Sequence, residues 1–515
     1  MNGAESLVRT LVGAGVDVCF TNPGTSEMHF VAALDRVPGM RCVLGLFEGV
    51  VTGAADGYAR MRDRPASTLL HLGPGLGNGL ANLHNARKAQ TPIVNIVGDH
   101  ATYHVAHDAP LTADIEGIAR PVSAWVRTSR DARSVARDGA EAVAAASAPP
   151  GQIATLILPA DTAWEEAEGP AAMPAVAPPA PVDQAAIREA AAALRSGAPA
   201  AILLGGRVLR GEGLTHAGRV AAASGARLIA QMSNARLERG AGRVTVERVP
   251  YAVDQALAML GGLDHIVLVG ASAPVAFFAY PDKPSRLWPE GCAIHTLARP
   301  DQDTVHALAW LADELGAAAD AAVLQAREAP PVPHDGPLTV DSIAAAVGAL
   351  LPENAVVVDE AISSGRGMHP FTRGSAPHDW LQICGGAIGI GLPLAVGAAV
   401  ACPDRKVVGL EADGSGMYTV QALWTQARES LDVTTLVFAN RAYASLKHEL
   451  ANVGARNPGR KALDMLEIGR PDLDWVALAR GMGLEAERVT TTGGLVRALR
   501  AGLASEGPYL VEAVI

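Results

Sequence analysis

The sequence has few aromatic side chains, few charges and few cysteines. Phe, Trp and Tyr together make up 4% of its 515 residues, and charged residues make up 18%, below the roughly 25% of an average soluble domain. Aromatic rings commonly line pockets for flat, apolar ligands, so their scarcity favours a small or polar ligand. The five cysteines lie far apart and form no C-x-x-C pair. This spacing excludes the common zinc and redox motifs and favours reduced thiols in a cytoplasmic protein.

An excess of positive charge is also missing. The 42 Lys and Arg residues against 53 Asp and Glu residues give a formal net charge of −11, and a negative surface repels phosphate backbones. We therefore expect no nucleic-acid partner. The first residues, MNGAESLVRTLVGAG, lack the basic and apolar regions of a signal peptide, and we expect none.

One charge-free stretch, residues 383–402, is long enough to span a membrane. Its GGAIGIGLP segment is more typical of a tight, buried turn that leads into a helix. We therefore expect no membrane association. Apolar residues make up 49% of the chain, which is enough to give each domain a core and excludes wholesale disorder.

Two proline-rich stretches divide the chain. Residues 165–183 and 327–337 resist helix and sheet formation and predict semi-rigid linkers. They separate a first domain (1–165), a central domain (183–327) and a third domain (337–515). Short apolar runs alternate with helical patterns in each, as in parallel sheets covered by helices on both faces. We predict an α/β protein with three doubly wound parallel-sheet domains in series. The runs predicted as strands are 16–23, 42–46, 67–75, 92–99, 155–160, 200–206, 227–231, 265–271, 293–297, 355–361, 406–415, 433–442 and 509–515.

The strongest chemical signal lies in the third domain. Asp413 directly follows the apolar run of one predicted strand, and Asn440 follows that of the next. Ligands bind beyond the carboxyl ends of parallel strands, so a carboxylate and an amide oxygen would meet there. Together they form half of a Mg²⁺ shell, which water and phosphate oxygens usually complete. Gly414 and the N–H groups of a helix from Ser415 onward would let a phosphate approach. An ordinary Asp-Gly turn beside a strand-end Asn is the alternative interpretation.

Two further signals lie in the first domain. Glu48 follows a predicted strand and opens a helix rich in Gly and Ala, which predicts a buried carboxyl suited to proton transfer. A first-turn Glu that only interacts with the helix dipole is the alternative. His71 opens the sequence HLGPGLGN (71–78) at another strand end. It points either into a cleft or into a core hydrogen bond.

Motifs along nearly the whole chain resemble a family, the thiamine-diphosphate-dependent enzymes of the acetolactate synthase, pyruvate decarboxylase and benzoylformate decarboxylase group. The resemblance implies pyrimidine-binding, central and diphosphate-binding domains, in this order. Its last motif is similar to the family's metal–diphosphate motif, with Ala412 in place of the first Gly. The matching stretches are TNPGTSE (21–27), FEGVVTGAADGYAR (47–60), HLGPGLGN (71–78), GGAIGIGLPLAVGAA (385–399) and EADGSGMY (411–418) with FANRAY (438–443).

The resemblance implies roles for individual residues. Glu48 would hydrogen-bond N1′ of the aminopyrimidine, and Ile388 would be the apolar wedge that bends the cofactor. The resemblance also implies thiamine diphosphate and Mg²⁺ as cofactors, and a homodimer or homotetramer with active sites at the subunit interface. The implied metal ligands are Asp413, Asn440 and the Ala442 carbonyl, and the other implied cofactor contacts are Pro23, Gly73, Asn78, Gly386, Gly414, Ser415 and Tyr443.

The implied reaction is the non-oxidative decarboxylation of a small-molecule 2-oxo acid. After carbon dioxide leaves, the resulting enamine is either protonated, which releases an aldehyde, or attacks a second carbonyl, which ligates it. An acetolactate (acetohydroxyacid) synthase-like carboligase is the alternative. A non-catalytic regulator of the same fold is disfavoured because Glu48, Asp413, Asn440 and Ile388 are all present.

Residues on the substrate side separate these subfamilies only in part. His71 resembles an active-site histidine of benzoylformate decarboxylases, and Thr25 takes the place of that group's serine. His107 lies in a stretch similar to the paired histidines of pyruvate decarboxylases, with a surface-loop histidine as the alternative. Glu449 stands where the decarboxylase has a ring, and the synthase's Trp is missing, so neither an aryl substrate nor classical acetolactate synthesis is favoured. The glycines of 203–213 are compatible with FAD, which we do not favour.

Overall fold

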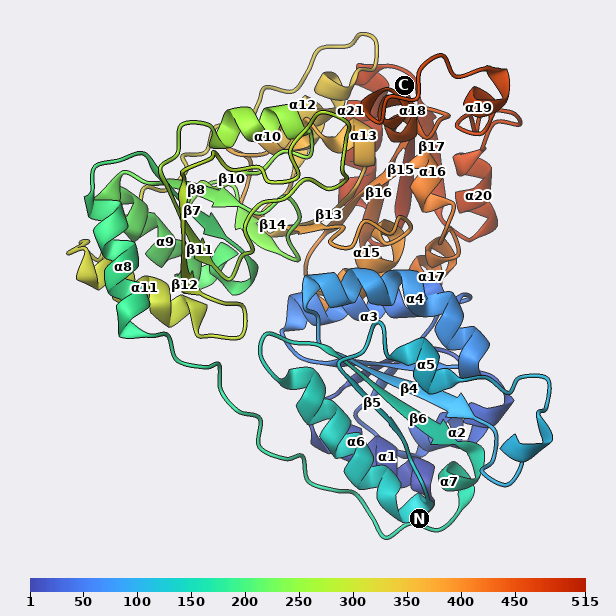
Figure 1. Cartoon of the computed structure of the whole chain (residues 1–515). Coiled ribbons are helices and arrows are strands. Elements are labelled where there is room, and N and C mark those ends of the chain that lie inside the picture. The colour runs from blue at the N-terminus through green and yellow to red at the C-terminus, as the bar shows by residue number, and fades with distance from the viewer.

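Three parallel β-sheets organise the molecule, each with helices on both faces. The computed structural model describes all residues, 1–515. Figure 1 shows the first domain (blue to teal) below the other two, with the first linker running along the outside of the molecule as an extended segment. The predicted fold class, three parallel-sheet α/β domains, is confirmed.

The first domain has a six-stranded parallel sheet in the order β2-β1-β3-β4-β6-β5. Helices α3, α4 and α5 cover one face and α1, α2, α6 and α7 the other. The strands are β1 (Val18–Asn22), β2 (Arg41–Leu44), β3 (Ala66–Leu70), β4 (Ile93–Asp99), β5 (Trp125–Thr128) and β6 (Ile153–Pro159). The helices are α1 (Gly3–Gly13), α2 (Met28–Arg36), α3 (Glu48–Arg62), α4 (Leu72–Ala89), α5 (Ile115–Ala119), α6 (Ala132–Ser147) and α7 (Ala160–Trp164).

The central domain has a five-stranded parallel sheet in the order β10-β8-β7-β11-β12. Helices α8, α9 and α11 pack together on one face, and α10 covers the other. The elements are α8 (Gln184–Arg195), β7 (Ala200–Leu204), α9 (Gly211–Ser224), β8 (Arg227–Ala230), β10 (Glu247–Arg248), α10 (Val253–Leu260), β11 (His265–Val269), β12 (Ala293–Ala298) and α11 (Thr304–Glu314).

The third sheet has seven strands in the order β17-β18-β16-β15-β13-β14-β9. Its last strand, β9 (Leu237–Arg239), comes from the central segment of the chain and pairs antiparallel with β14. The other strands are β13 (Ala355–Glu360), β14 (His378–Gln382), β15 (Val407–Ala412), β16 (Val433–Ala439), β17 (Glu485–Val489) and β18 (Tyr509–Val514). The helices are α12 (Val340–Leu350), α13 (Ile362–Gly365), α14 (Met368–Phe371), α15 (Gly391–Ala401), α16 (Asp413–Gly416), α17 (Ala422–Arg428), α18 (Ala444–Asn452), α19 (Arg460–Asp464), α20 (Trp475–Gly481) and α21 (Thr492–Ala504).

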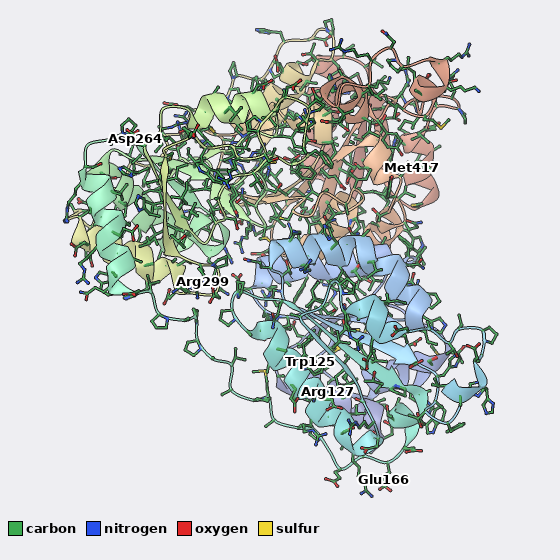
Figure 2. The ribbon with its side chains drawn as sticks, in the orientation of Figure 1. Trp125, Arg127, Glu166, Asp264, Arg299 and Met417 are labelled. Atoms are coloured by element: carbon green, nitrogen blue, oxygen red, sulfur yellow. The ribbon has the colours of Figure 1, made fainter.

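Five strands lie outside the predicted runs: β5, β9, β10, β14 and β17. Four of them, β5, β9, β10 and β17, are edge strands and carry charged side chains, so they contain no continuous apolar run. In β5, the guanidinium of Arg127 lies 5.0 Å from the ring centroid of Trp125, and Figure 2 shows both side chains in the first domain. The polar strand β14 is buried because its His378 and Asp379 find partners inside the protein.

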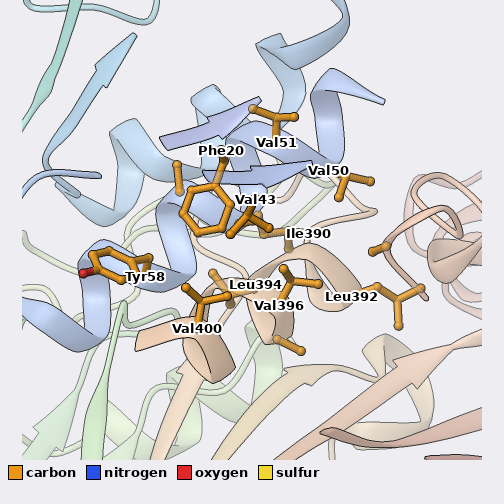
Figure 3. Close-up of a cluster of buried hydrophobic side chains, with 14 of the residues drawn as sticks. Phe20, Val43, Val50, Val51, Tyr58, Ile390, Leu392, Leu394, Val396 and Val400 are labelled. Atoms are coloured by element: carbon orange, nitrogen blue, oxygen red, sulfur yellow. The ribbon is translucent and has the colours of Figure 1, made fainter. Parts of the chain in front are cut away.

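Residues 383–402 form the predicted buried turn and helix. Every residue of α15 is buried. The helix packs against α3 of the first domain, and Gly57 and Gly397 lie at the contact, where a Cβ would collide with the backbone of the other helix. Figure 3 shows the apolar side chains that fill this contact. No helix in the protein is both long and apolar enough to cross a membrane.

Buried arginines connect the three domains. Arg60 forms an ion pair with Asp56 inside α3 at 2.6 Å, and it also donates to the carbonyl of Gln382 in the third domain at 2.7 Å. Arg236 of the central segment pairs with Asp379 at 2.6 Å and donates to the last-turn carbonyls of α3. These charge-assisted bonds fix α3 and the central segment in position relative to β14.

Candidate active site

Glu48 is a buried carboxyl held by one hydrogen bond. It is the first residue of α3 and is 8% exposed, so the predicted burial is confirmed. Asn78 of α4 donates to Oε2 at 2.9 Å. Gly75 lies beside Oε1, and a Cβ at that glycine would come within 3.1 Å of the oxygen. The carboxyl is thus oriented from α4, and the glycine leaves it room.

His71 is hydrogen-bonded to Glu27, the last residue of the TNPGTSE motif, for which the sequence predicted no role. Its Nδ1 lies 2.8 Å from Oε2 of Glu27, which also accepts from the N–H of Gly24 at 2.7 Å. Glu27 is 1% exposed, and burial raises the pKa of its carboxyl. Because Nδ1 is engaged, Nε2 is the ring nitrogen that remains for a ligand. The strand predicted over 67–75 ends at Leu70, and the glycine-rich stretch after His71 forms the first turns of α4.

Thr25 lies next to this pair. It begins a short 3₁₀ helix (Thr25–Glu27) and is exposed, while the backbone of Gly24 packs directly against the His71 ring. The structure therefore brings the TNPGTSE motif and His71 together. Pro23, in the same motif, is half-buried.

His107 is not joined to this group. It is exposed at the end of a 3₁₀ helix (Val105–His107), and its ring centroid lies 5.6 Å from that of His104. No hydrogen bond connects it to Glu48 or His71. Gly73 is buried, and a Cβ there would collide with Ala113. The roles implied for these two residues stay predictions.

Asp413 and Asn440 occupy neighbouring strand ends, as the sequence predicts. Asp413 directly follows β15, and Asn440 directly follows β16, which is its parallel neighbour. Oδ2 of Asp413 accepts from the N–H of Arg441 at 2.6 Å, and Oδ1 accepts from the N–H of Gly414 at 2.9 Å. Asn440 Oδ1 accepts from the N–H of Ala442 at 3.0 Å. The helix expected from Ser415 begins instead at Asp413 and ends at Gly416.

The donor set at these strand ends fits a divalent cation. Asp413 is 3% exposed and has no Lys, Arg or His within ion-pair distance. Burial raises the pKa of its carboxyl to about 6, and a bound cation would favour the ionised form instead. Asn440 and the Ala442 carbonyl supply further hard oxygen ligands. The ring of Tyr443 packs over Gly414. The hydroxyl of Ser415 donates to Glu411 at 2.6 Å, so a phosphate contact from Ser415 would use its N–H.

The wedge segment, residues 385–389 around Ile388, is held by two domains. Asn82 and Asn85 of α4 donate to its carbonyls at 3.2 and 2.7 Å. From the third domain, Glu360 accepts from the N–H of Gly389 at 2.9 Å. Ile388 itself is half-buried. Asn78, which orients Glu48, lies one helical turn before Asn82 on the same face of α4, so one helix contacts both Glu48 and the wedge segment.

Glu360 and Glu411 form a buried carboxyl pair beneath this segment. They are register partners on β13 and β15, and each is 1% exposed. Burial raises the pKa of Glu360 to about 8. Burial and the neighbouring Glu360 charge raise the pKa of Glu411 well above its usual range. Glu360 accepts from the N–H groups of Gly389 and Gly391, which favour a charged carboxylate. We therefore infer that Glu411 carries the proton of the pair.

Replacing Glu411 with Gln is expected to flatten the pH dependence of stability. In the unfolded chain both carboxyls lose their protons near pH 4.3, whereas in the folded pair Glu411 keeps its proton to a much higher pH. The unfolded state binds fewer protons in this window, so the free energy of unfolding falls as pH rises through it. Glu411→Gln needs no proton and should lose this decline. Thermal unfolding across the window measures the effect, with exposed Glu506→Gln as the control; identical slopes for wild type and Glu411→Gln would contradict it.

An aromatic cluster, absent from any sequence motif, adjoins the wedge segment. The ring of Phe277 packs against Gly386, where a Cβ would lie 2.6 Å from Cζ. Its centroid lies 4.9 Å from that of Phe278 and 5.4 Å from that of Tyr251. The hydroxyl of Tyr251 donates to Oε1 of Glu449 at 3.3 Å. The few rings of this chain are thus partly concentrated beside the predicted cofactor site.

Comparison with known proteins identifies the family. Residues 1–118 match the model of the thiamine pyrophosphate enzyme N-terminal TPP binding domain, and residues 364–513 match the model of the C-terminal TPP binding domain. The chain is 56% identical, over its full length and 99% of the relative, to a candidate acetolactate synthase large subunit, IlvX, of Mycobacterium tuberculosis. The chain belongs to the thiamine-diphosphate-dependent enzymes. The predicted family is confirmed, and its TPP-binding domains support thiamine diphosphate as the cofactor.

Two further proteins similar to this thiamine-diphosphate-dependent enzyme are decarboxylases by name. Benzoylformate decarboxylase of Pseudomonas aeruginosa is 30% identical over 97% of this chain and 96% of its own. The solved structure of a 4-hydroxybenzoylformate decarboxylase from Rhodococcus jostii superimposes with a TM-score of 0.86 at 24% identity, covering 99% of this chain and 98% of that one. The latter likeness shows the fold. The enzyme is therefore of the decarboxylase or acetolactate synthase-like type.

Proposed function

We propose that the protein is a thiamine-diphosphate- and Mg²⁺-dependent decarboxylase that releases carbon dioxide and an aldehyde from a 2-oxo acid. The observation that carries this proposal is the hydrogen-bonded pair of His71 and Glu27 beside Thr25. An imidazole held in one orientation, with Nε2 free, can deliver a proton to a carbon or oxygen of the substrate. Protonation is the step that leads to aldehyde release rather than ligation.

Each part of the site has a role in this proposal. Asp413, Asn440 and the Ala442 carbonyl would hold Mg²⁺, and Ile388 would support the bent cofactor. Glu48 would exchange a proton with the aminopyrimidine nitrogen, and Asn78 keeps its carboxyl in place. Thiamine diphosphate, when bound, supplies the electron sink for decarboxylation. The surrounding chain positions it, excludes water and moves protons.

Removing the His71 imidazole is expected to lower kcat about 10²–10⁴-fold, the usual contribution of a positioned general acid or base. Glu27→Gln should lower kcat less than His71→Ala does, because the imidazole remains. It should, however, shift the pH profile of kcat/KM, because it removes the hydrogen-bonded carboxylate. Steady-state kinetics across pH would measure both effects. Exposed His334→Ala is the control, and a His71→Ala enzyme with wild-type kcat would refute the role.

The aromatic cluster indicates what kind of side group the 2-oxo acid carries. Composition alone favours a small or polar 2-oxo acid. Phe277 and Tyr251 instead provide apolar walls next to Gly386, which supports a 2-oxo acid with an apolar or aromatic side group. A panel of 2-oxo acids, incubated with enzyme, thiamine diphosphate and Mg²⁺, tests this. Faster turnover of pyruvate than of larger apolar or aryl substrates would contradict it.

The carboligase remains the second candidate, favoured by the name of the relative in Mycobacterium tuberculosis. The same panel distinguishes the two reactions by product. Free aldehyde with stoichiometric carbon dioxide supports the decarboxylase, whereas acetolactate from pyruvate supports the synthase. We also propose a homodimer or homotetramer, which light scattering coupled to gel filtration would test.

A further inference from the structure

A cavity of about 350 Å³ lies where the central segment meets the third domain. Its walls come from β9, β10 and the residues that follow them, and from α14 with its flanking residues. In Figure 1, β10 lies on the side of the central sheet that faces β14. This cavity shares no residue with the site built from Glu48, His71 and Asp413.

Four arginines line this cavity: Arg239, Arg248, Arg366 and Arg373. None of them has a carboxylate within ion-pair distance, although most arginines that form ion pairs elsewhere in the chain do so with Asp or Glu at 4.0 Å or less. The two carboxylates in the lining are already engaged. Glu247 forms a two-pronged pair with Arg227, and Glu238 pairs with Arg243 at 3.6 Å and accepts from the N–H of Gly211. The cavity therefore carries an uncompensated positive charge.

Two buried groups in the cavity wall have no hydrogen-bond partner. They are Nη1 of Arg239 and Nε2 of His369. Arg239 is only 8% exposed, and its guanidinium is fixed 5.1 Å from the ring centroid of Trp380. Burial and the nearby Arg248 lower the pKa of Arg239 to about 9. Burial and Arg239 also lower the pKa of His369 well below its usual range.

Asp359 lies behind the wall and attracts Arg239 and Arg248, but it forms no ion pair with either. Its Oδ2 accepts from the Trp380 indole at 3.2 Å, and its Oδ1 accepts from the N–H of Ala361 at 3.3 Å. A buried cation without a partner is costly, and native structures rarely keep one without a ligand or a role. An oxyanion bound by Arg239 and Arg248 would remove this cost, because guanidinium groups bind phosphate oxygens two at a time. Arg366 and Arg373 are exposed and add positive charge at the edge of the cavity.

We propose that this cavity binds the phosphate group of a small phosphorylated organic molecule. Several arginines match a phosphate, which carries about −1.5 to −2 charges at neutral pH, better than a single carboxylate. The size, at the lower end of the about 300–1,000 Å³ of small-molecule sites, leaves room for more than the phosphate. Leu209 and Met259 provide apolar wall for the organic part. The site goes beyond the proposed decarboxylase and does not depend on it.

Binding to the cofactor-saturated protein tests the proposal, because thiamine diphosphate and Mg²⁺ then occupy the other phosphate site. Calorimetry would compare ribose 5-phosphate, inorganic phosphate and ribose at constant ionic strength. We expect ribose 5-phosphate to bind at least tenfold more tightly than inorganic phosphate, and ribose not to bind. Arg239→Met and Arg248→Gln should each weaken ribose 5-phosphate at least tenfold, and exposed Arg133→Gln, which removes the same charge elsewhere, should not.

Three results would overturn the proposal. One is a Kd above about 10 mM for every phosphate probe. Another is wild-type affinity in both Arg239→Met and Arg248→Gln. The third is inorganic phosphate binding as tightly as ribose 5-phosphate, which would mean that the cavity does not recognise the organic part. Arg248 is half-buried, so Arg248→Gln provides the test if Arg239→Met does not fold.

Discussion

Glu48→Gln is expected to lower kcat by about 10²–10⁴-fold while thiamine diphosphate still binds. The amide keeps the size of the side chain, and its oxygen can still accept from Asn78. It cannot, however, gain and lose the proton that the aminopyrimidine nitrogen requires. Loss of one positioned proton-transfer group typically costs a factor in this range. Turnover and cofactor affinity, measured on the same preparation, separate the two effects.

The control for this variant is Glu212→Gln. Glu212 is an exposed acidic residue in the first turn of α9. It therefore shares with Glu48 the favourable interaction with a helix N-terminus, worth about 0.3–1 kcal/mol, but it has no place in the site. If Glu48 acted only through the helix dipole, the two variants would lose similar stability and keep full activity. Unchanged turnover in Glu48→Gln would remove the proton-transfer role.

Asp413→Ala is expected to abolish Mg²⁺-dependent cofactor binding, with at least a hundredfold loss of affinity. Asp413 is the only carboxylate of the proposed metal shell, since Asn440 and Ala442 contribute neutral oxygens. Mg²⁺ sheds its water reluctantly and is normally held through one or two carboxylates. In wild type, thiamine diphosphate with Mg²⁺ should raise the unfolding temperature by mass action, and Asp413→Ala should lose this rise.

Two further measurements make the Asp413 result specific. A chelator added to wild type should reproduce the loss of cofactor-dependent stabilisation. Asp472→Ala, which removes an exposed carboxylate paired with Arg441, should leave it intact. If Asp413→Ala retains Mg²⁺-dependent binding, the metal is held elsewhere.

Residues at strand ends could be located from the sequence, but their partners could not. Asp413, Asn440 and Glu48 each follow an apolar run, and the rule for parallel sheets then places them at the ligand-binding edge. Glu27 lies 44 residues from His71, and Glu360 lies 29 residues from Gly389. Such pairs depend on how whole strands and helices pack, and no local pattern reports that.

Composition does not locate side chains, for the same reason. The scarcity of rings describes the chain average, whereas Tyr251 and Phe277 come from separate loops of the central segment and meet only after folding. Likewise, β9 has three residues with two charges, and it joins a sheet whose other strands lie more than 100 residues away. Its place follows from an open hydrogen-bonding edge at β14, which the sequence does not display.

Because two domains hold the wedge segment, a single domain cannot be exchanged freely for that of a relative. Asn82 and Asn85 hold it from the first domain, and Glu360 holds it from the third. A chimera that takes its first domain from a relative would exchange one set of these anchors and keep the other. The turn would then be supported on one side only, even if both domains fold. Grafts for altered substrate use should therefore move α4 and residues 385–391 together.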